Sequence, residues 1–263
     1  MGPSDRAATF RRQTMTRCFA ADTWLAETLA RPVFKWTGCT EGVAEGRLAA
    51  EMVELANGGD AFFFARMPTT DVSQCAAFSR AGFSVVDTGI TFAWAGEVEA
   101  PQSDISVGVV RPEQHAAVTE IAGRCFRWSR FHLDPRIPVG LANLVKRRWI
   151  ESYCRGHRGT VLYVGSVDDR VAGFLAVLES SMENRPYAAI DLIGVSPEYQ
   201  GRGVGTALVR RFVEDWRERA KELRVGTQAA NVQSLRFYER NGFRAVGSSY
   251  VLHAHYYGGG IGT

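Results

Sequence analysis

The residues best suited to chemistry form a short glycine-rich loop, Gln200–Gly205, with the sequence Q-G-R-G-V-G. The glycines at its second, fourth and sixth positions let the backbone come close to a ligand and direct successive N–H groups toward it. An apolar, strand-like run ends before the loop at Pro197, and an amphipathic helical pattern begins directly after it. Because the N-terminal end of a helix favours anions, the loop predicts a site for a phosphate-bearing ligand.

Two well-known phosphate loops differ from this one. A Walker loop has Lys and then Ser or Thr after its last glycine, whereas Thr206 follows Gly205 with no lysine. The dinucleotide fingerprint has the spacing G-x-G-x-x-G, and the spacing here is G-x-G-x-G. A purely structural glycine turn between a strand and a helix stays open at this point.

The same segment resembles the acetyl-CoA motif of the GNAT superfamily of N-acetyltransferases, [QR]-x-x-G-x-[GA] after a V-x-P strand end. Gln200–Gly205 follows Val195-Ser196-Pro197, and every constrained position matches. The resemblance implies acetyl-CoA as co-substrate, with its pyrophosphate on backbone N–H groups and its pantetheine arm paired to a strand, as an added strand would be. It also implies that the strands Ala188–Val195 and Leu223–Gln228 splay apart to admit that arm. The implied coenzyme A contacts are Ile193, Gly194, Val195, Gln200, Gly201, Arg202, Gly203, Val204, Gly205, Thr206 and Asn231.

Two downstream residues carry a further part of the resemblance. Asn231 follows a predicted strand, and Tyr238 lies on the next predicted helix. The resemblance implies that Tyr238 is the general acid that protonates the departing thiolate. A phenol, with an ordinary pKa near ~10, is a proton donor at neutral pH and suits a basic thiolate. The alternative for Tyr238 is an aromatic side chain packed between a helix and the sheet.

A bound ammonium group must lose a proton before its nitrogen attacks a thioester. Asp191 lies four residues before Val195, where other GNAT enzymes place a base, and strand alternation predicts Asp191, Ile193 and Val195 on one face. Asp191 is therefore the predicted general base, with His132 and Glu179 as weaker candidates. Its alternative role is a carboxylate bonded to a strand end or an arginine.

Other forms of catalysis are not expected. Cys125 and Cys154 have no evident histidine partner, so a covalent intermediate is not predicted. His253 and His255 share a strand face, but two histidines without a third ligand are weak evidence for a metal, and no metal is expected.

A loop of aromatic and basic residues, Arg127–Pro138, is the predicted acceptor site. Guanidinium groups suit phosphate, and aromatic rings suit a base or a sugar face. The alternative is a surface loop with its charges in water.

Parts of that loop and two later segments resemble the branch of the family that acetylates nucleotide-linked amino sugars, the dTDP-4-amino-4,6-dideoxygalactose N-acetyltransferases among them. These parts are Ser129–Pro138, Arg147–Ser152 and Leu223–Asn231. The resemblance implies that a primary amine on a sugar nucleotide is the acceptor, bound by Arg130, His132 and Gln228. Another small amine, such as an antibiotic, a polyamine or a natural-product intermediate, stays open, as does a coenzyme A-binding module without turnover.

The elements that must position these residues alternate between strands and helices. An apolar strand at Ala188–Val195 is typical of a covered central sheet, and the whole pattern predicts an α/β (α+β) architecture. The resemblance specifies it as the GNAT fold, a mixed central sheet flanked by helices. The polar segment Gly96–Asp104 predicts a boundary, with a smaller, partly GNAT-like α/β domain over residues 1–98 and the acetyltransferase domain over residues 104–257.

A faint internal repeat crosses that boundary. Residues 61–92 and 223–252 both read as strand, helix, glycine–aromatic turn and strand. Gly82 and Gly242 suit the left-handed position after a helix end. A duplication and the chance recurrence of a common α/β unit are both open.

Composition excludes several classes of protein. The 263 residues are 46% hydrophobic and 22% charged with a formal net charge of +3, which is ordinary for a globular protein and gives no basic stripe for nucleic acid. No apolar run approaches the ~18 residues of a membrane span, and the N-terminal region lacks the apolar core of a secretory signal. Five scattered cysteines without a C-x-x-C pair argue against a disulfide framework or a zinc site and for the cytoplasm. The expected partner is a small-molecule amine, with no nucleic acid and no membrane; a homodimer stays open.

Overall fold

The computed structural model describes residues 17–38, 45–96, 105–182, 185–258 and 260–261. The strands are β1 (Phe19–Ala21), β2 (Val33–Trp36), β3 (Ala61–Pro68), β4 (Ser84–Trp94), β5 (Ser106–Val109), β6 (Val161–Val167), β7 (Arg170–Met182), β8 (Arg185–Val195), β9 (Glu222–Gln228), β10 (Phe243–Tyr257) and β11 (Gly260–Ile261). The α-helices are α1 (Thr23–Leu29), α2 (Glu45–Ala56), α3 (Val72–Arg80), α4 (His115–Ala122), α5 (Arg130–Leu133), α6 (Val139–Cys154), α7 (Val204–Trp216) and α8 (Val232–Arg240). Short 3₁₀ turns cover Pro112–Gln114 and Pro197–Tyr199.

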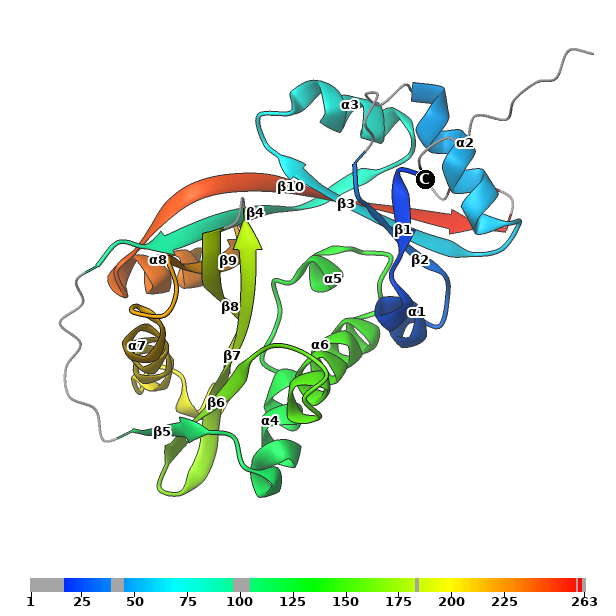
Figure 1. Ribbon diagram of the computed structural model, residues 1–263. Helices are drawn as coiled ribbons and strands as arrows, with labels where there is room; N and C mark the ends of the chain where they lie inside the picture. The colour runs from blue at the N-terminus through cyan, green and yellow to red at the C-terminus, as the bar shows by residue number, and fades with distance from the viewer. Residues whose placement is uncertain (1–16, 39–44, 97–104, 183–184, 259, 262–263) are drawn as a thin grey trace, which may run out of the picture.

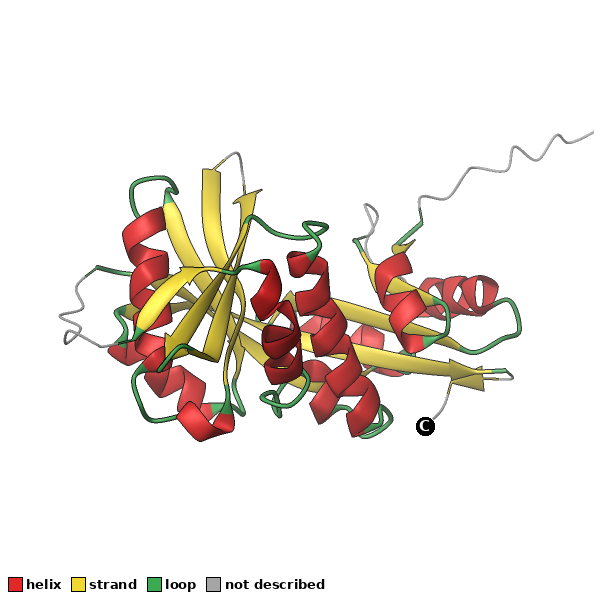
Figure 2. Cartoon of the chain, turned by 90° about the horizontal axis from the view of Figure 1, so that it is seen from below, coloured by secondary structure: helices red, strands yellow, loops and turns green. Residues whose placement is uncertain are grey.

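One mixed sheet carries all of these strands, in the order β1-β2-β3-β10-β4-β9-β8-β7-β6-β5, with β11 paired to β10. The β2–β3 and β8–β9 pairs are parallel, and the other pairs are antiparallel. Helices lie on both faces of the strands, as Figure 2 shows. The predicted mixed sheet flanked by helices is confirmed.

Two apolar layers fix the part of the sheet that matters for chemistry. On one face, Leu208 and Phe212 of α7 pack with Ile190 and Val225 in one buried cluster. On the other face, α4 and α6 pack against β6, β7 and β8 in a second cluster that contains Phe174. Figure 1 shows α7 and α8 on one side of these strands and α4, α5 and α6 on the other. A ligand bound between β8 and β9 would therefore contact different groups on the two faces of the sheet, those beside α7 and α8 on one face and those beside α4, α5 and α6 on the other.

The centre of the sheet joins the N-terminal and C-terminal parts of the chain. β3, α3 and β4 follow one another, as do β9, α8 and β10, but β10 lies between β3 and β4, and β4 lies between β9 and β10. Gly82 and Gly242, the turn glycines of the two units, have φ values of +91° and +80°, as predicted. Each unit thus donates a strand to the other, which favours a duplication. The division into domains 1–98 and 104–257 stays a prediction, and part of its boundary lies outside the described residues.

Cys18 corrects one expectation. It is disulfide-bonded, whereas Cys75, Cys125 and Cys154 are free. The spacing of cysteines along a chain does not show which segments the fold brings together, and the argument from cysteines for a reducing compartment falls with this bond. In the part of the chain that the structure describes, no helix combines the length and the apolar composition that crossing a membrane requires.

Candidate active site

β8 and β9 separate beside the glycine-rich loop. Their parallel pairing runs from Tyr187↔Glu222 to Ile190↔Val225 and then stops. Beyond that point β8 remains paired to β7 as far as Val195, and β9 remains paired to β4 as far as Gln228. The facing edges of the two strands are therefore unpaired, and an extended chain of amide groups can bond to them as an added strand does. This is the splay that the sequence resemblance implied.

The glycine loop leads from this gap into α7. Gly201 and Gly203 have φ values of +78° and +86°, and Gly203 is the residue that caps the start of α7. The first intrahelical bond runs from the N–H of Ala207 to the carbonyl of Gly203. The N–H groups of residues 204–206 donate to no other described residue, as expected for the first turn of a helix. Free amides at a helix start form a site for a diphosphate.

The side chains in and beside the loop are packed against the protein or exposed to solvent. A Cβ atom on Gly205 would lie 3.2 Å from the ring of Phe237, so the first turn of α7 is tightly packed against α8. Val204 is buried in the core, and the Gln200 amide donates to the carbonyl of Val195 at 3.3 Å. Arg202 is exposed and lies over the Tyr199 ring. Backbone amides, rather than these side chains, are thus what the loop offers to an anion.

We expect Gly203→Ala to weaken coenzyme A binding about tenfold, because a side chain in the left-handed region costs roughly 1–2 kcal/mol. Space is not the obstacle, since the nearest atom to the added Cβ would be 3.7 Å away. Gly156→Ala is the matched control: Gly156 has a φ of +68° and open space around it, but follows α6, away from the loop. Calorimetric titration with coenzyme A should separate the two variants. Equal affinities would show that the loop conformation does not serve the coenzyme.

Tyr238 lies in the core beneath α8. Its ring contacts the rings of Phe92, Phe237 and Phe243, and burial raises the pKa of its phenol. No hydrogen bond from its hydroxyl to another described residue is present, and burial is the only cause of its pKa shift. The ring is therefore fixed by packing and the hydroxyl remains free for a ligand, which fits both the acid role and the packing alternative.

Asn231 has a structural role that the sequence reading missed. Its side-chain oxygen accepts from the N–H of Ser234 at 3.1 Å and so caps the start of α8. The amide nitrogen is left for a ligand, and the coenzyme A contact stays a prediction.

Asp191 is placed differently from the prediction. A bulge in β8 makes Asp191 an extra residue between the pairs Val177↔Ile190 and Ala176↔Leu192. The predicted common face is therefore wrong: Ile193 and Val195 pack on the side of α7, whereas Asp191 bonds to the side chains of α6. A bulge reverses the alternation that the prediction assumed.

The contacts of Asp191 also argue against a base. Its Oδ2 accepts from Trp149 Nε1, Tyr153 Oη and Arg158 Nε, each at 2.8 Å. Burial would raise the pKa of Asp191, but Arg158, Trp149 and Tyr153 together hold it below its ordinary value. A fully bonded carboxylate with a low pKa is a poor proton acceptor, so the alternative role, a carboxylate bonded to an arginine, describes it.

The predicted acceptor residues Arg130 and His132 are also engaged within the protein. Both ring nitrogens of His132 are bonded, to Ser129 Oγ at 2.6 Å and to Asn143 Oδ1 at 2.9 Å. The Arg130 guanidinium lies 4.0 Å from the Phe64 ring centre. Gln228, at the end of β9, is half-buried beside the gap. The structure thus brings Gln228 to the gap and gives His132 a structural network.

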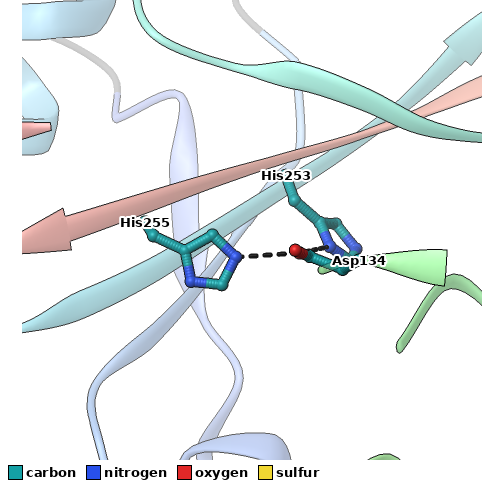
Figure 3. Close-up of side chains that lie close together, drawn as sticks. All are labelled: Asp134, His253 and His255. Atoms are coloured by element: carbon teal, nitrogen blue, oxygen red, sulfur yellow. Dashed lines mark hydrogen bonds and ion pairs between the residues drawn. The ribbon is translucent and has the colours of Figure 1, made fainter. Parts of the chain in front are cut away.

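Asp134 joins the two histidines that the sequence left as a pair (Figure 3). Its Oδ2 accepts from His253 Nδ1 at 2.7 Å and from His255 Nε2 at 2.8 Å, and all three side chains are buried. The opposite ring nitrogens face Arg130 and Arg31, each at 3.1 Å. The only sequence signal for Asp134 was its place in the segment Ser129–Pro138.

These three residues have the composition of a metal site, with ligand atoms within 4.8 Å of one another. The arginines argue for a different use. A guanidinium only donates, so each histidine must turn its single lone pair toward its arginine and carry its proton toward Asp134. A metal ion bound beside Asp134 would instead need lone pairs on His253 Nδ1 and His255 Nε2, the nitrogens that carry the protons. The cluster is therefore a hydrogen-bonded network, Arg31–His255–Asp134–His253–Arg130, that ties α1 and α5 to β10.

The opened strand pair and the free amides at the head of α7 define a class of protein. The model of the acetyltransferase (GNAT) family matches residues 116–243. The chain contains a GNAT acetyltransferase domain.

Particular relatives can be named. The chain is 30% identical over 148 residues to the spore coat polysaccharide biosynthesis protein SpsD of Bacillus subtilis, which covers 56% of this chain and 50% of that one. It is 26% identical over 200 residues to a dTDP-fucosamine acetyltransferase of Escherichia coli, which covers 72% and 80% of the two chains. The chain thus spans about half the length of SpsD. A solved GCN5-related N-acetyltransferase of Sphaerobacter thermophilus shares the fold, with a TM-score of 0.56 at 13% identity over 85% of this chain and 72% of that one.

Proposed function

We propose that this protein transfers the acetyl group of acetyl-CoA to a primary amine, and that the amine is carried by a nucleotide-linked sugar. The gap between β8 and β9, with the free amides of α7 at its end, carries the first part of the proposal. The diphosphate would lie on residues 200–206, and the pantetheine arm would run between the unpaired strand edges. Tyr238, with its unbonded hydroxyl, would give a proton to the thiolate.

The acceptor class rests on other support. The relatives include a dTDP-fucosamine acetyltransferase and a spore coat polysaccharide biosynthesis protein, both connected by name with sugars. A basic side chain that suits phosphate, Arg66, lies beside Gly89, which pairs with Gln228 at the end of β9. Reaction of free amine and thioester in this gap needs no covalent intermediate, since holding the two groups together lowers the barrier. A location in the cytoplasm is part of the same proposal.

The test is the release of free thiol from acetyl-CoA with a panel of amines. We expect dTDP-4-amino-4,6-dideoxygalactose or another dTDP- or UDP-amino sugar to support turnover on the order of 1–10³ s⁻¹. The same sugars with the amine already acetylated are the matched control and should release no thiol. Turnover with polyamines or aminoglycosides and with none of the nucleotides would remove the sugar claim and keep the acetyl transfer. Coenzyme A binding without turnover on any amine would leave a binding module.

A further inference from the structure

Asp87 of β4 is a buried carboxylate without a close hydrogen-bond partner among the described residues. It is 6% exposed, and neither of its oxygens has a hydrogen-bond partner among the described residues. The nearby groups are the charged Arg66 from β3 and Arg130 from α5, and the Gln228 amide and the Thr88 N–H, which lower the pKa of Asp87 without reaching either oxygen at close hydrogen-bond distance. Buried polar groups in folded proteins are nearly always bonded, and an unpaired one is costly. Asp87 therefore requires another explanation.

Its position in the sheet is at the open end of the gap. β4 and β9 are paired from Ala93↔Arg224 to Gly89↔Gln228, so Asp87 lies two residues beyond the last pair. This is the end at which β9 has separated from β8. The unbonded carboxylate thus lies next to the strand edge along which the thioester would run.

The face on which Asp87 lies is open at Gly226, on the gap edge of β9. Asp87 and Gly89 are two residues apart in β4 and share a face. A Cβ atom on Gly89 would come within 3.9 Å of Arg66 Nη2, so this face carries Arg66. A Cβ on Gly226, at the gap edge of β9, would meet nothing within 4 Å. The open surface at Gly226 leaves room for a substrate, whereas Gly89 packs against Ser249, whose Oγ would lie 3.3 Å from an added Cβ.

Tyr238 approaches from the opposite face. It packs against Phe92, which is five residues from Asp87 in the same strand and therefore points the other way. A thioester held in the gap would have a phenol on the side of α8 and a carboxylate on the side of α5. The proton donor for the thiolate and the proton acceptor for the ammonium group would thus lie on opposite sides of the thioester, where each can act on a different atom.

We propose that Asp87 receives the ammonium group of the acceptor and takes its first proton. The proposal rests on the acetyl transfer proposed above. The ammonium gives one proton to the carboxylate, and the neutral nitrogen attacks the thioester carbonyl. A C–N bond forms and the C–S bond breaks. The thiolate takes the Tyr238 proton, the nitrogen's second proton restores the phenol, and Asp87 releases its own proton to solvent. The products are the amide, free coenzyme A and one proton.

The electrostatics of the site agree with this role. Burial raises the pKa of Asp87 to about 6, although Arg66, Thr88, Gln228 and Arg130 lower it. The group is ionised at neutral pH, yet it accepts a proton more readily than an ordinary aspartate does. Because the native pKa lies above the unfolded value, the stability that this group contributes is present at low pH and is lost as the pH rises through about 6. At neutral pH the ionised Asp87 therefore lowers the stability of the fold, which is expected of a residue that has a catalytic role rather than a structural one.

The test compares Asp87→Asn, Asp87→Glu and the wild type, with acetyl-CoA and dTDP-4-amino-4,6-dideoxygalactose, from about pH 5 to about pH 10. We expect Asp87→Asn to lower kcat/KM about 100-fold at neutral pH, and to recover as the amine itself becomes neutral. The acid limb of the wild-type profile should disappear in Asp87→Asn and return in Asp87→Glu. Binding of coenzyme A should not change.

Thermal stability separates this role from a structural one. At about pH 8 Asp87→Asn should melt no lower than the wild type, because it removes an unpaired charge. Asp191→Asn, the matched change at a fully bonded buried aspartate, should melt lower. A lower melting temperature for Asp87→Asn, with a loss of activity independent of pH, would overturn the proposal, as would an unchanged kcat/KM. A wild type inactive with every amine would overturn the proposed function and this inference together, whereas an active wild type with an equally active Asp87→Asn would overturn the inference alone.

Discussion

Replacement of Tyr238 by Phe is expected to lower kcat about 100-fold or more and to leave the affinity for coenzyme A nearly unchanged. The change removes one oxygen atom that makes no hydrogen bond within the described protein, so the packing against Phe92 and Phe243 is kept. What is lost is the proton for the thiolate, and a positioned acid contributes roughly 10²–10⁴-fold. Steady-state kinetics with acetyl-CoA, and calorimetry with coenzyme A, measure the two quantities.

The pH dependence of kcat gives a second test of the role of Tyr238. Burial raises the pKa of Tyr238, so the phenol stays protonated through neutral and mildly alkaline conditions. The basic limb of the wild-type profile should therefore lie above the ordinary ~10 of a tyrosine. Tyr257→Phe, at a residue that is 42% exposed, is the matched control and should keep full activity. If Tyr238→Phe retained the wild-type kcat, Tyr238 would be a packing residue and the thiolate would take its proton from elsewhere.

Asp134→Asn should lower the free energy of unfolding by about 3–5 kcal/mol, the usual loss when one partner of a buried charged network is removed. One carboxylate oxygen accepts from two buried histidines, and their other nitrogens accept from Arg130 and Arg31. An amide at this place would leave two guanidinium charges without a counter-charge. Urea unfolding at neutral pH measures the effect, with Asp169→Asn, in an exposed turn, as the control. A loss below about 1 kcal/mol, as for a surface pair, would contradict the prediction.

Acid should weaken the same network. Burial lowers the pKa of His253 to about 4, although its bond to Asp134 opposes this. The unfolded histidine takes up a proton near its ordinary 6.5 and the native one does not, so stability is lost as the pH falls from about 6.5 to about 4. Treatment of the wild type with a chelator should leave the melting temperature unchanged. A lower melting temperature after chelation would show that the three residues hold a metal after all.

Residues whose role depends on the local backbone were predictable. Gly82 and Gly242 were predicted at the left-handed position after helix ends, and both have positive φ values. The glycine-rich loop was predicted from its residue types and its place between a strand and a helix, and the structure shows positive φ values at Gly201 and Gly203. Neighbouring residues determine such conformations, so a single sequence is enough to find them. The nearly continuous apolar run at Ala188–Val195 likewise predicted a strand covered on both faces.

Residues whose role depends on distant segments were not predictable in this way. One extra residue in β8 turns Asp191 away from Ile193 and Val195, and nothing in the run of side chains marks that bulge. Asp134 is more than a hundred residues from His253, and Asp87 reaches the gap only because β4 is inserted beside β9.

The sequence by itself determined the glycine-rich loop, the helix that carries Tyr238 and the mixed α/β architecture, because short-range sterics and periodicity specify them. Tertiary structure alone decided that Asp191 and Asp134 are bonded to other side chains and that Asp87, among the described residues, is buried without a close hydrogen bond. That difference depends on which strands pair, and strand pairing is a property of the whole chain.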